Sequence, residues 1–113
     1  MMNMNEALAR LVDEIKADYL KFTSRDFTRE LSDVNKKMIN DFNEGLQIQE
    51  GRKYIKIMSE RSVWGFIMKE DDKQFKAGDI LKAASYNAPA RNKARGNVFA
   101  DAYTVQWTGP LYL

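Results

Sequence analysis

The spacing of apolar residues changes near residue 46, and this change constrains the fold of the chain most strongly. In residues 1–45, apolar side chains recur at steps of three and four, which is the period of a helix buried on one side. From Leu46 onward, short β-branched and aromatic runs alternate with polar residues, a pattern typical of strands. The sequence therefore predicts a helical hairpin over residues 1–45 and a β-rich part over residues 46–113.

Two helices are predicted in the first part. Asn3 or Asn5 can cap the first helix, and the Thr23–Asp26 segment before the second resembles a capping box. Gly45 suits the position just after a helix end. The expected apolar stripes are Leu8, Leu11, Val12, Ile15, Tyr19 and Phe22 in the first helix and Phe27, Leu31, Val34, Met38 and Phe42 in the second.

The second part predicts a small antiparallel sheet. A polar segment, Ser59–Ser62, has the length of a hairpin loop between two apolar runs. The expected strands are residues 46–50, 53–58, 63–68, 80–84 and 103–107. A length of 113 residues fits one domain, residues 1–113. We therefore expect an α+β fold in which two N-terminal amphipathic helices pack on an antiparallel sheet, or on a partly closed barrel, of about four to five strands.

Composition argues against an enzyme. The chain contains no cysteine and no histidine, which excludes disulfides, thiolate metal sites, cysteine nucleophiles and the commonest general base. It also lacks a phosphate-binding glycine loop, a dinucleotide-binding motif and a serine hydrolase motif. We expect no catalytic residues, no metal site and no cofactor.

The sequence predicts neither a membrane span nor a secretory signal. The first residues, Met1–Glu6, have no basic and apolar signal-peptide pattern. The longest apolar run, Val63–Met68, is interrupted by Gly65 and is far shorter than the roughly 20 residues of a membrane helix. We therefore expect the chain to remain in the compartment in which it is made.

Positive charge is concentrated in the second part of the chain. Residues 1–50 contain seven basic and ten acidic residues, whereas residues 51–113 contain eleven basic and six acidic residues. A clustered basic face is typical of nucleic-acid binding, and ordinary surface charge is the alternative.

The segment Lys82–Asn97 is the main candidate binding loop, because it contains no acidic residue and predicts neither helix nor strand. Irregular segments often hold binding residues. In an extended chain, Arg91, Lys93 and Arg95 point the same way at about 7 Å intervals, near the spacing of phosphates. The alternative is a solvated surface loop. The candidate nucleic-acid-binding residues of this basic loop, residues 82–98, are Lys82, Tyr86, Arg91, Lys93 and Arg95.

Other candidate features favour structural roles. Trp64 and Phe66 are expected on one sheet face, and Tyr103, Val105 and Trp107 also share a face. An exposed aromatic face can stack on bases, but core positions are the favoured interpretation. The acidic run 70–72 is interpreted as a turn rather than a cation site. The apolar C-terminus, residues 111–113, is expected to dock on the core, with a contact between copies in a homo-oligomer as the alternative.

Residues 50–113 contain a set of short motifs, which are Glu50–Ile57, Ser62–Ile67, Phe75–Ser85, Ala88–Ala90, Arg95–Asn97 and Trp107–Pro110. Together these motifs resemble a small uncharacterised protein family encoded by tailed bacteriophages. The resemblance implies a phage product that acts in the bacterial cytoplasm, and it implies no activity, cofactor or active site.

The leading functional hypothesis is a phage-encoded accessory protein, not an enzyme, that binds nucleic acid through the basic loop. The alternative is a protein-interaction module that contacts a host or phage protein, as an inhibitor of a host factor or as a virion or assembly component.

Overall fold

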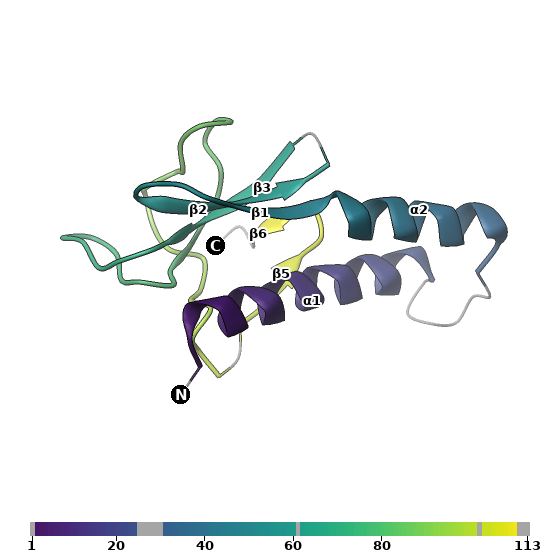
Figure 1. Cartoon of the computed structure of the whole chain (residues 1–113), viewed down its shortest axis with the longest axis horizontal. Coiled ribbons are helices and arrows are strands. Elements are labelled where there is room, and N and C mark those ends of the chain that lie inside the picture. The colour runs from purple at the N-terminus through teal and green to yellow at the C-terminus, as the bar shows by residue number, and fades with distance from the viewer. Residues whose placement is uncertain (1, 25–30, 61, 102, 111–113) are drawn as a thin grey trace.

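The computed structural model describes residues 2–24, 31–60, 62–101 and 103–110. It confirms the predicted α+β class and the order of helices before strands (Figure 1). The elements are α1 (Met4–Thr23), α2 (Asp33–Gly45), β1 (Leu46–Glu50), β2 (Tyr54–Ser59), β3 (Ser62–Met68), β4 (Ile80–Leu81), β5 (Val105–Gln106) and β6 (Gly109–Pro110).

Four strands form one antiparallel sheet in the order β1-β2-β3-β4. The last two strands, β5 and β6, pair with each other in a separate two-stranded sheet. In the described part of the chain β1 and β4 do not pair, so the sheet is open and the expectation of a partly closed barrel is wrong. The physical reason is that β5 turns back on β6 instead of joining the two sheet edges.

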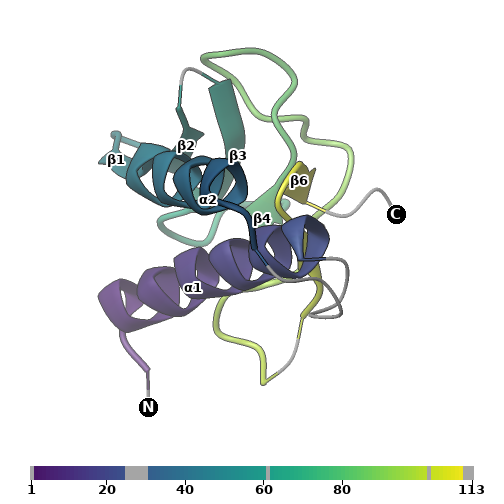
Figure 2. The ribbon, with the colours of Figure 1, turned by 90° about the vertical axis from the view of Figure 1, so that its right-hand side faces the viewer.

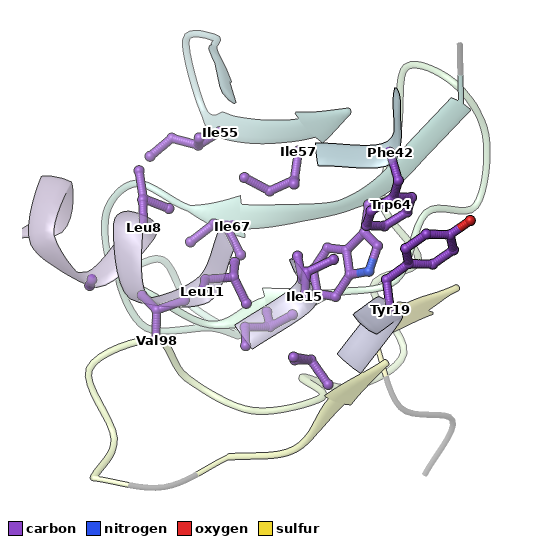
Figure 3. Packing of buried hydrophobic residues seen from close by; sticks show 13 residues of the cluster. Leu8, Leu11, Ile15, Tyr19, Phe42, Ile55, Ile57, Trp64, Ile67 and Val98 are labelled. Carbon is purple, nitrogen blue, oxygen red and sulfur yellow. The ribbon is translucent and has the colours of Figure 1, made fainter. Parts of the chain in front are cut away.

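Helix α1 covers one face of the four-stranded sheet. Asn3 caps the helix, because its side-chain oxygen accepts a 2.8 Å hydrogen bond from the Glu6 amide. Figure 3 shows the apolar side of α1 facing β2 and β3. Phe22 departs from the predicted stripe, since it is 63% exposed in the last turn of the helix, near the Trp107 ring. The α1 residues buried in the core are Ala7, Leu8, Leu11, Ile15 and Tyr19.

Helix α2 does not bury the predicted apolar stripe. Val34 is 69% exposed and Met38 is 46% exposed, whereas Asn35 and Phe42 are buried. Helix α2 extends beyond the sheet and lies beside the end of α1 (Figure 1). The rest of the protein therefore covers a narrow strip of the α2 surface, the strip that carries Asn35 and Phe42. The main contact is the Phe42 ring, which stacks on Tyr19 at 4.1 Å between centroids.

The start of α2 also differs from the prediction. Ser32 is its N-cap and accepts a 3.1 Å hydrogen bond from the Asn35 amide. Thr23, the first residue of the predicted capping box, is instead the last residue of α1, and Ser24 caps that helix. Residues 25–30 of the predicted box and stripe lie outside the described residues, as does the C-terminal run 111–113.

A bulge in β3 places Trp64 and Phe66 on opposite faces of the sheet, contrary to the prediction. Ile57 pairs with Gly65 and Met58 pairs with Val63, so Trp64 is the extra residue. Trp64 therefore joins the core under α1, and Phe66 joins a second apolar cluster on the other face.

The other face of the sheet is also covered. In Figure 1 the green segment after β4 rises above the sheet while α1 runs below it, and Figure 2 shows the same arrangement from the end. This segment contributes Ala83 and Ala94 to the second apolar cluster, which is centred on the buried side chains Phe66, Met68, Phe75 and Leu81.

Residues 98–100 and Trp107 are hydrogen-bonded to α1. The Arg10 guanidinium donates hydrogen bonds of 2.7 and 2.6 Å to the carbonyl oxygens of Val98 and Ala100. The Trp107 amide donates a 2.8 Å hydrogen bond to the Asp18 carboxylate. Among the described residues, neither helix is both long and apolar enough to cross a lipid bilayer.

Candidate nucleic-acid interface

The basic loop folds back on itself instead of extending into solvent. The Ala90 amide donates to the Lys82 carbonyl at 2.7 Å, and the Arg95 amide donates to the Ile80 carbonyl at 2.7 Å. An isolated bridge joins Ala83 to Pro89. The contacts of Ala90 and Pro89 close the loop on its own start, the Arg95 contact ties its later part to β4, and residues 84–88 are left as its exposed tip.

Arg91 connects this loop to the sheet and to an acidic turn. Its guanidinium donates 2.6 Å hydrogen bonds to the Tyr54 hydroxyl and to the Asp72 carboxylate. It also lies 4.9 Å from the centroid of the Phe75 ring. The pKa of Asp72 is held well below its ordinary value, first by the Phe75 amide and then by Arg91 and the Gln74 amide. Arg91 is therefore engaged in holding the loop in place.

Arg91, Lys93 and Arg95 do not form the open row that their spacing predicts. Arg95 is 5% exposed, and its guanidinium contacts the Asn92 side chain at 3.4 Å. Lys93, between them, is exposed. Residues 91–95 form no regular strand, so the alternation on which the shared direction depends does not hold, and Arg95 is buried while Lys93 is exposed.

Tyr86 is the predicted residue with the most favourable position for binding. It lies at the loop tip and is 54% exposed. The Lys56 ammonium, from β2, lies 4.1 Å from the centroid of the Tyr86 ring, within the range of a cation–π interaction. The fold thus brings together a cation and an aromatic ring that are 30 residues apart in the sequence.

A pocket of about 280 Å³ lies beside this pair and has a basic rim. Arg52, Lys53 and Lys56 line it, together with Asn87 from the loop tip. We call Arg52, Lys53, Lys56, Tyr86 and Asn87 the basic-aromatic surface.

Two carboxylates near the basic-aromatic surface are already paired. Glu50 lines the pocket, and its carboxylate lies 2.7 Å from the Lys69 ammonium, which lowers the pKa of Glu50. Asp72 lies 3.6 Å from the Lys53 ammonium, but it bonds more closely to Arg91. The carboxylates therefore reduce the positive charge of the surface less than unpaired acids would.

Lys82 lies in a different place. It lines a pocket of about 240 Å³ between β3 and the β5–β6 hairpin, with Trp64 and Gln106 among its neighbours. Thus Tyr86 belongs to the basic-aromatic surface, Lys82 lies in this second pocket, and Arg91 and Arg95 have packing roles.

Comparison with known protein families relates the whole chain to one family. The family of unknown function DUF7717 matches residues 1–113. The chain belongs to this family. No curated protein and no solved structure matches the chain. The match confirms membership in a family of unknown function, and it covers the helices as well as the β-rich part.

The aromatic residues of this DUF7717 protein have mainly core positions, as the favoured interpretation predicts. Trp64 is 3% exposed, and its indole N–H donates a 2.8 Å hydrogen bond to the Gln106 carbonyl. Trp107 is half-buried and meets Tyr19 edge to face at 5.0 Å between centroids. Neither tryptophan therefore provides a stacking surface beside Tyr86.

The acidic segment of the DUF7717 chain forms the predicted turn. One Asp72 oxygen accepts hydrogen bonds from the Gln74 and Phe75 amides at 2.8 and 2.7 Å. Asp71 accepts one from the Ala77 amide at 2.7 Å. Within the described ranges, no group of three or more acidic side chains is arranged to hold a metal ion.

Sequence reasoning missed Arg52, Lys53 and Lys56 as members of the site. The sequence offered one signal. Arg52 lies between the predicted strands 46–50 and 53–58, and Lys53 and Lys56 lie on the second of these strands. Lys56 alternates with Ile55 and Ile57, so it lies on the face opposite α1. Its distance from Tyr86 depends on the path of a loop that comes much later in the sequence.

Proposed function

We propose that this DUF7717 protein binds single-stranded nucleic acid at the basic-aromatic surface. It acts as a non-enzymatic accessory protein, encoded by a tailed bacteriophage, in the bacterial cytoplasm. The phage origin rests on the motifs of residues 50–113. The observation that carries the binding proposal is the Lys56 ammonium, 4.1 Å from the centre of an exposed Tyr86 ring.

The chemistry of this pair suits a single strand. An exposed aromatic ring stacks on any base, because each base has a flat π face, and nearby ammonium groups contact the phosphates. Lys56 occupies one side of the Tyr86 ring, so a base stacks on the other side. Arg52 and Lys53 extend the positive charge along the pocket rim, and the Asn87 amide adds neutral hydrogen-bonding groups.

Arg91 stabilises the basic-aromatic surface through a contact with Tyr54. It bonds to the Tyr54 hydroxyl, and Tyr54 forms part of the pocket wall. Arg91 therefore positions the loop and the pocket and does not itself contact the strand. Its substitution tests folding, so it is unsuitable as the first test of binding.

The test is a titration of labelled oligothymidine, oligouridine and a duplex by fluorescence anisotropy at several salt concentrations. We expect saturable binding to the single strands and a linear fall of log K with log salt. The triple variant Arg52→Ala/Lys53→Ala/Lys56→Ala should bind more weakly and show a shallower salt slope, since it makes fewer phosphate contacts.

A matched control removes the same charge elsewhere. Lys36, Lys73 and Lys76 are exposed and lie outside the pocket lining, so their triple alanine variant should keep both affinity and slope. Tyr86→Leu should weaken binding while Tyr86→Phe preserves it, because phenylalanine keeps the ring. Absence of saturable binding at low salt, or equal effects of the two triple variants, contradicts the proposal.

A protein-interaction role is the second candidate, and the exposed apolar residues of α2 favour it. Val34 and Met38 are one helical turn apart and both are exposed, so they form a small apolar patch, and an exposed apolar patch is a feature of protein–protein contact sites. A pull-down from nuclease-treated bacterial lysate, with Val34→Asp/Met38→Asp as the comparison, tests this role. An equal yield with both baits argues against it.

A further inference from the structure

Strand β1 is an uncovered edge of the four-stranded sheet. In the described part of the chain it pairs with β2 and with no other strand. Every second residue of an edge strand directs its N–H and C=O groups outward, where they can pair with another strand. Natural edges are commonly protected by charged residues, above all lysine, by proline or by a bulge. The sequence Leu46-Gln-Ile-Gln-Glu50 has no lysine and no proline, and its pairing with β2 has no register shift. Its one charged residue, Glu50, is the last of the strand and is paired with Lys69.

An apolar groove follows this edge on the side of α1. Ile48, in the middle of β1, is 45% exposed. It lines a pocket of about 240 Å³ together with Met4 and Leu8 of α1 and Ile55 of β2. An added strand beside β1 would place its own side chains against Ile48 and the groove.

The charged residues that flank β1 indicate which added strand is complementary to this edge. Glu44 lies at the end of α2, four residues before Ile48, and Arg52 lies four residues after it. Both are exposed. Glu44 is in the last turn of α2 and Arg52 is in the turn between β1 and β2, so opposite charges lie just beyond the two ends of β1. If a second copy pairs antiparallel and is centred on Ile48, the Glu44 end of each copy meets the Arg52 end of the other copy. A parallel arrangement would instead place like charges together.

We propose that two copies of this chain form a symmetric dimer by antiparallel pairing of β1 with β1, centred on Ile48. The two sheets then form one continuous sheet of eight strands. Strand pairing supplies main-chain hydrogen bonds, the two Ile48 side chains pack together, and a Glu44–Arg52 pair forms at each end. This inference does not depend on nucleic-acid binding.

The dimer has a geometric consequence. A two-fold axis perpendicular to a sheet keeps the same face of both copies on the same side. Both α1 helices then lie on one side of the joined sheet, and both loop tips with Tyr86 lie on the other.

The first experiment is sedimentation velocity of the full chain from about 1 µM to about 500 µM, a range that covers weak strand-mediated dimers. We expect a concentration-dependent shift from monomer to dimer. Ile48→Lys should remain monomeric, because it places two ammonium groups together at the symmetry axis. A wild-type monomer at the highest concentration, or a dimer that persists in Ile48→Lys, overturns the proposal.

Charge exchange gives an independent test with exposed residues. Glu44→Arg and Arg52→Glu should each weaken dimerisation by about tenfold or more, because each places like charges together at both ends. The double variant Glu44→Arg/Arg52→Glu should regain wild-type dimerisation, because it restores opposite charges between copies. Lys76→Glu is the control for a charge reversal outside β1 and its two flanking charges, and it should have no effect. Failure of the double variant to recover contradicts this pairing.

Discussion

The Arg91 guanidinium and the Asp72 carboxylate are 2.6 Å apart and form the contact that fastens the basic loop to the acidic turn. Each partner has a further contact, Arg91 with the Tyr54 hydroxyl and Asp72 with the Phe75 amide. The loop therefore joins β2 and the turn through one guanidinium. In the basic loop, the charged group of Arg91 stabilises the fold, whereas the charged group of Lys93 is exposed and accessible to a ligand.

The first prediction concerns acid stability. The fold lowers the pKa of Asp72 below its ordinary value of 3.8, so the folded state favours the charged carboxylate. This contribution is fully present above pH 3.8, and it is lost as the pH falls below that value. The difference in Tm between the wild type and Asp72→Asn should therefore be largest near neutral pH and shrink below pH 3.8. Thermal unfolding followed by circular dichroism at a series of pH values measures it, and a constant difference would be inconsistent with this role.

The second prediction separates Arg91 from its neighbour Lys93. Arg91→Ala should lower the Tm clearly, since it removes bonds to Tyr54 and Asp72 together. Lys93→Ala should change the free energy of unfolding by less than about 0.5 kcal/mol, as expected for an exposed side chain. Tyr54→Phe removes one hydrogen bond and should cost about 1 kcal/mol. Urea unfolding of the three variants checks this order, and equal effects of Arg91→Ala and Lys93→Ala would refute it.

The third prediction compares the two helices. Ile15 of α1 is fully buried, so Ile15→Ala should lower the free energy of unfolding by about 2–5 kcal/mol. Val34 of α2 is 69% exposed, and Val34→Ala should change it by no more than about 0.5 kcal/mol. Chemical denaturation measures both values. A large effect at Val34 would mean that the predicted stripe of α2 is buried after all.

The fourth prediction uses fluorescence to locate the two tryptophans. The variant Trp107→Phe retains Trp64, which is 3% exposed, so its emission should be blue-shifted and resistant to iodide. The variant Trp64→Phe retains the half-buried Trp107 and should be quenched more readily. Stern–Volmer slopes of the two variants give the comparison. Stronger quenching of Trp64 would argue against the bulge that turns it under α1.

Local patterns were sufficient to predict most of the first sheet. The alternation in residues 46–50 gives the bounds of β1, and the polar Ser59–Ser62 segment correctly marks the turn between β2 and β3. The stripe on α1 was predictable for the same reason, because one side of that helix packs on a broad sheet. The exceptions are Val12, which is half-buried and outside the core cluster, and Phe22, which lies in the last turn.

Features that depend on distant parts of the chain were not predictable from local spacing. The prediction of a buried apolar stripe on α2 is wrong because the helix extends past the sheet. Among the described residues, no surface covers Val34 and Met38. The bulge at Trp64 arises from strand pairing, which periodicity alone does not specify. Likewise, Lys56 meets Tyr86 because the loop folds back on β4, and this path also buries Arg95.

The hydrogen bonds from Arg10 to Val98 and Ala100, and from Trp107 to Asp18, span 88 to 90 residues of sequence. A ribosome that adds about 5–20 residues per second makes the second partner of each pair several seconds after the first. At the start of that interval the apolar side of α1 has neither the four-stranded sheet nor residues 98–107 to contact, and the sheet strands follow first. The contacts of α1 are therefore completed only after residue 107 has been made, and newly made α1 is the segment for which a chaperone would have the greatest use.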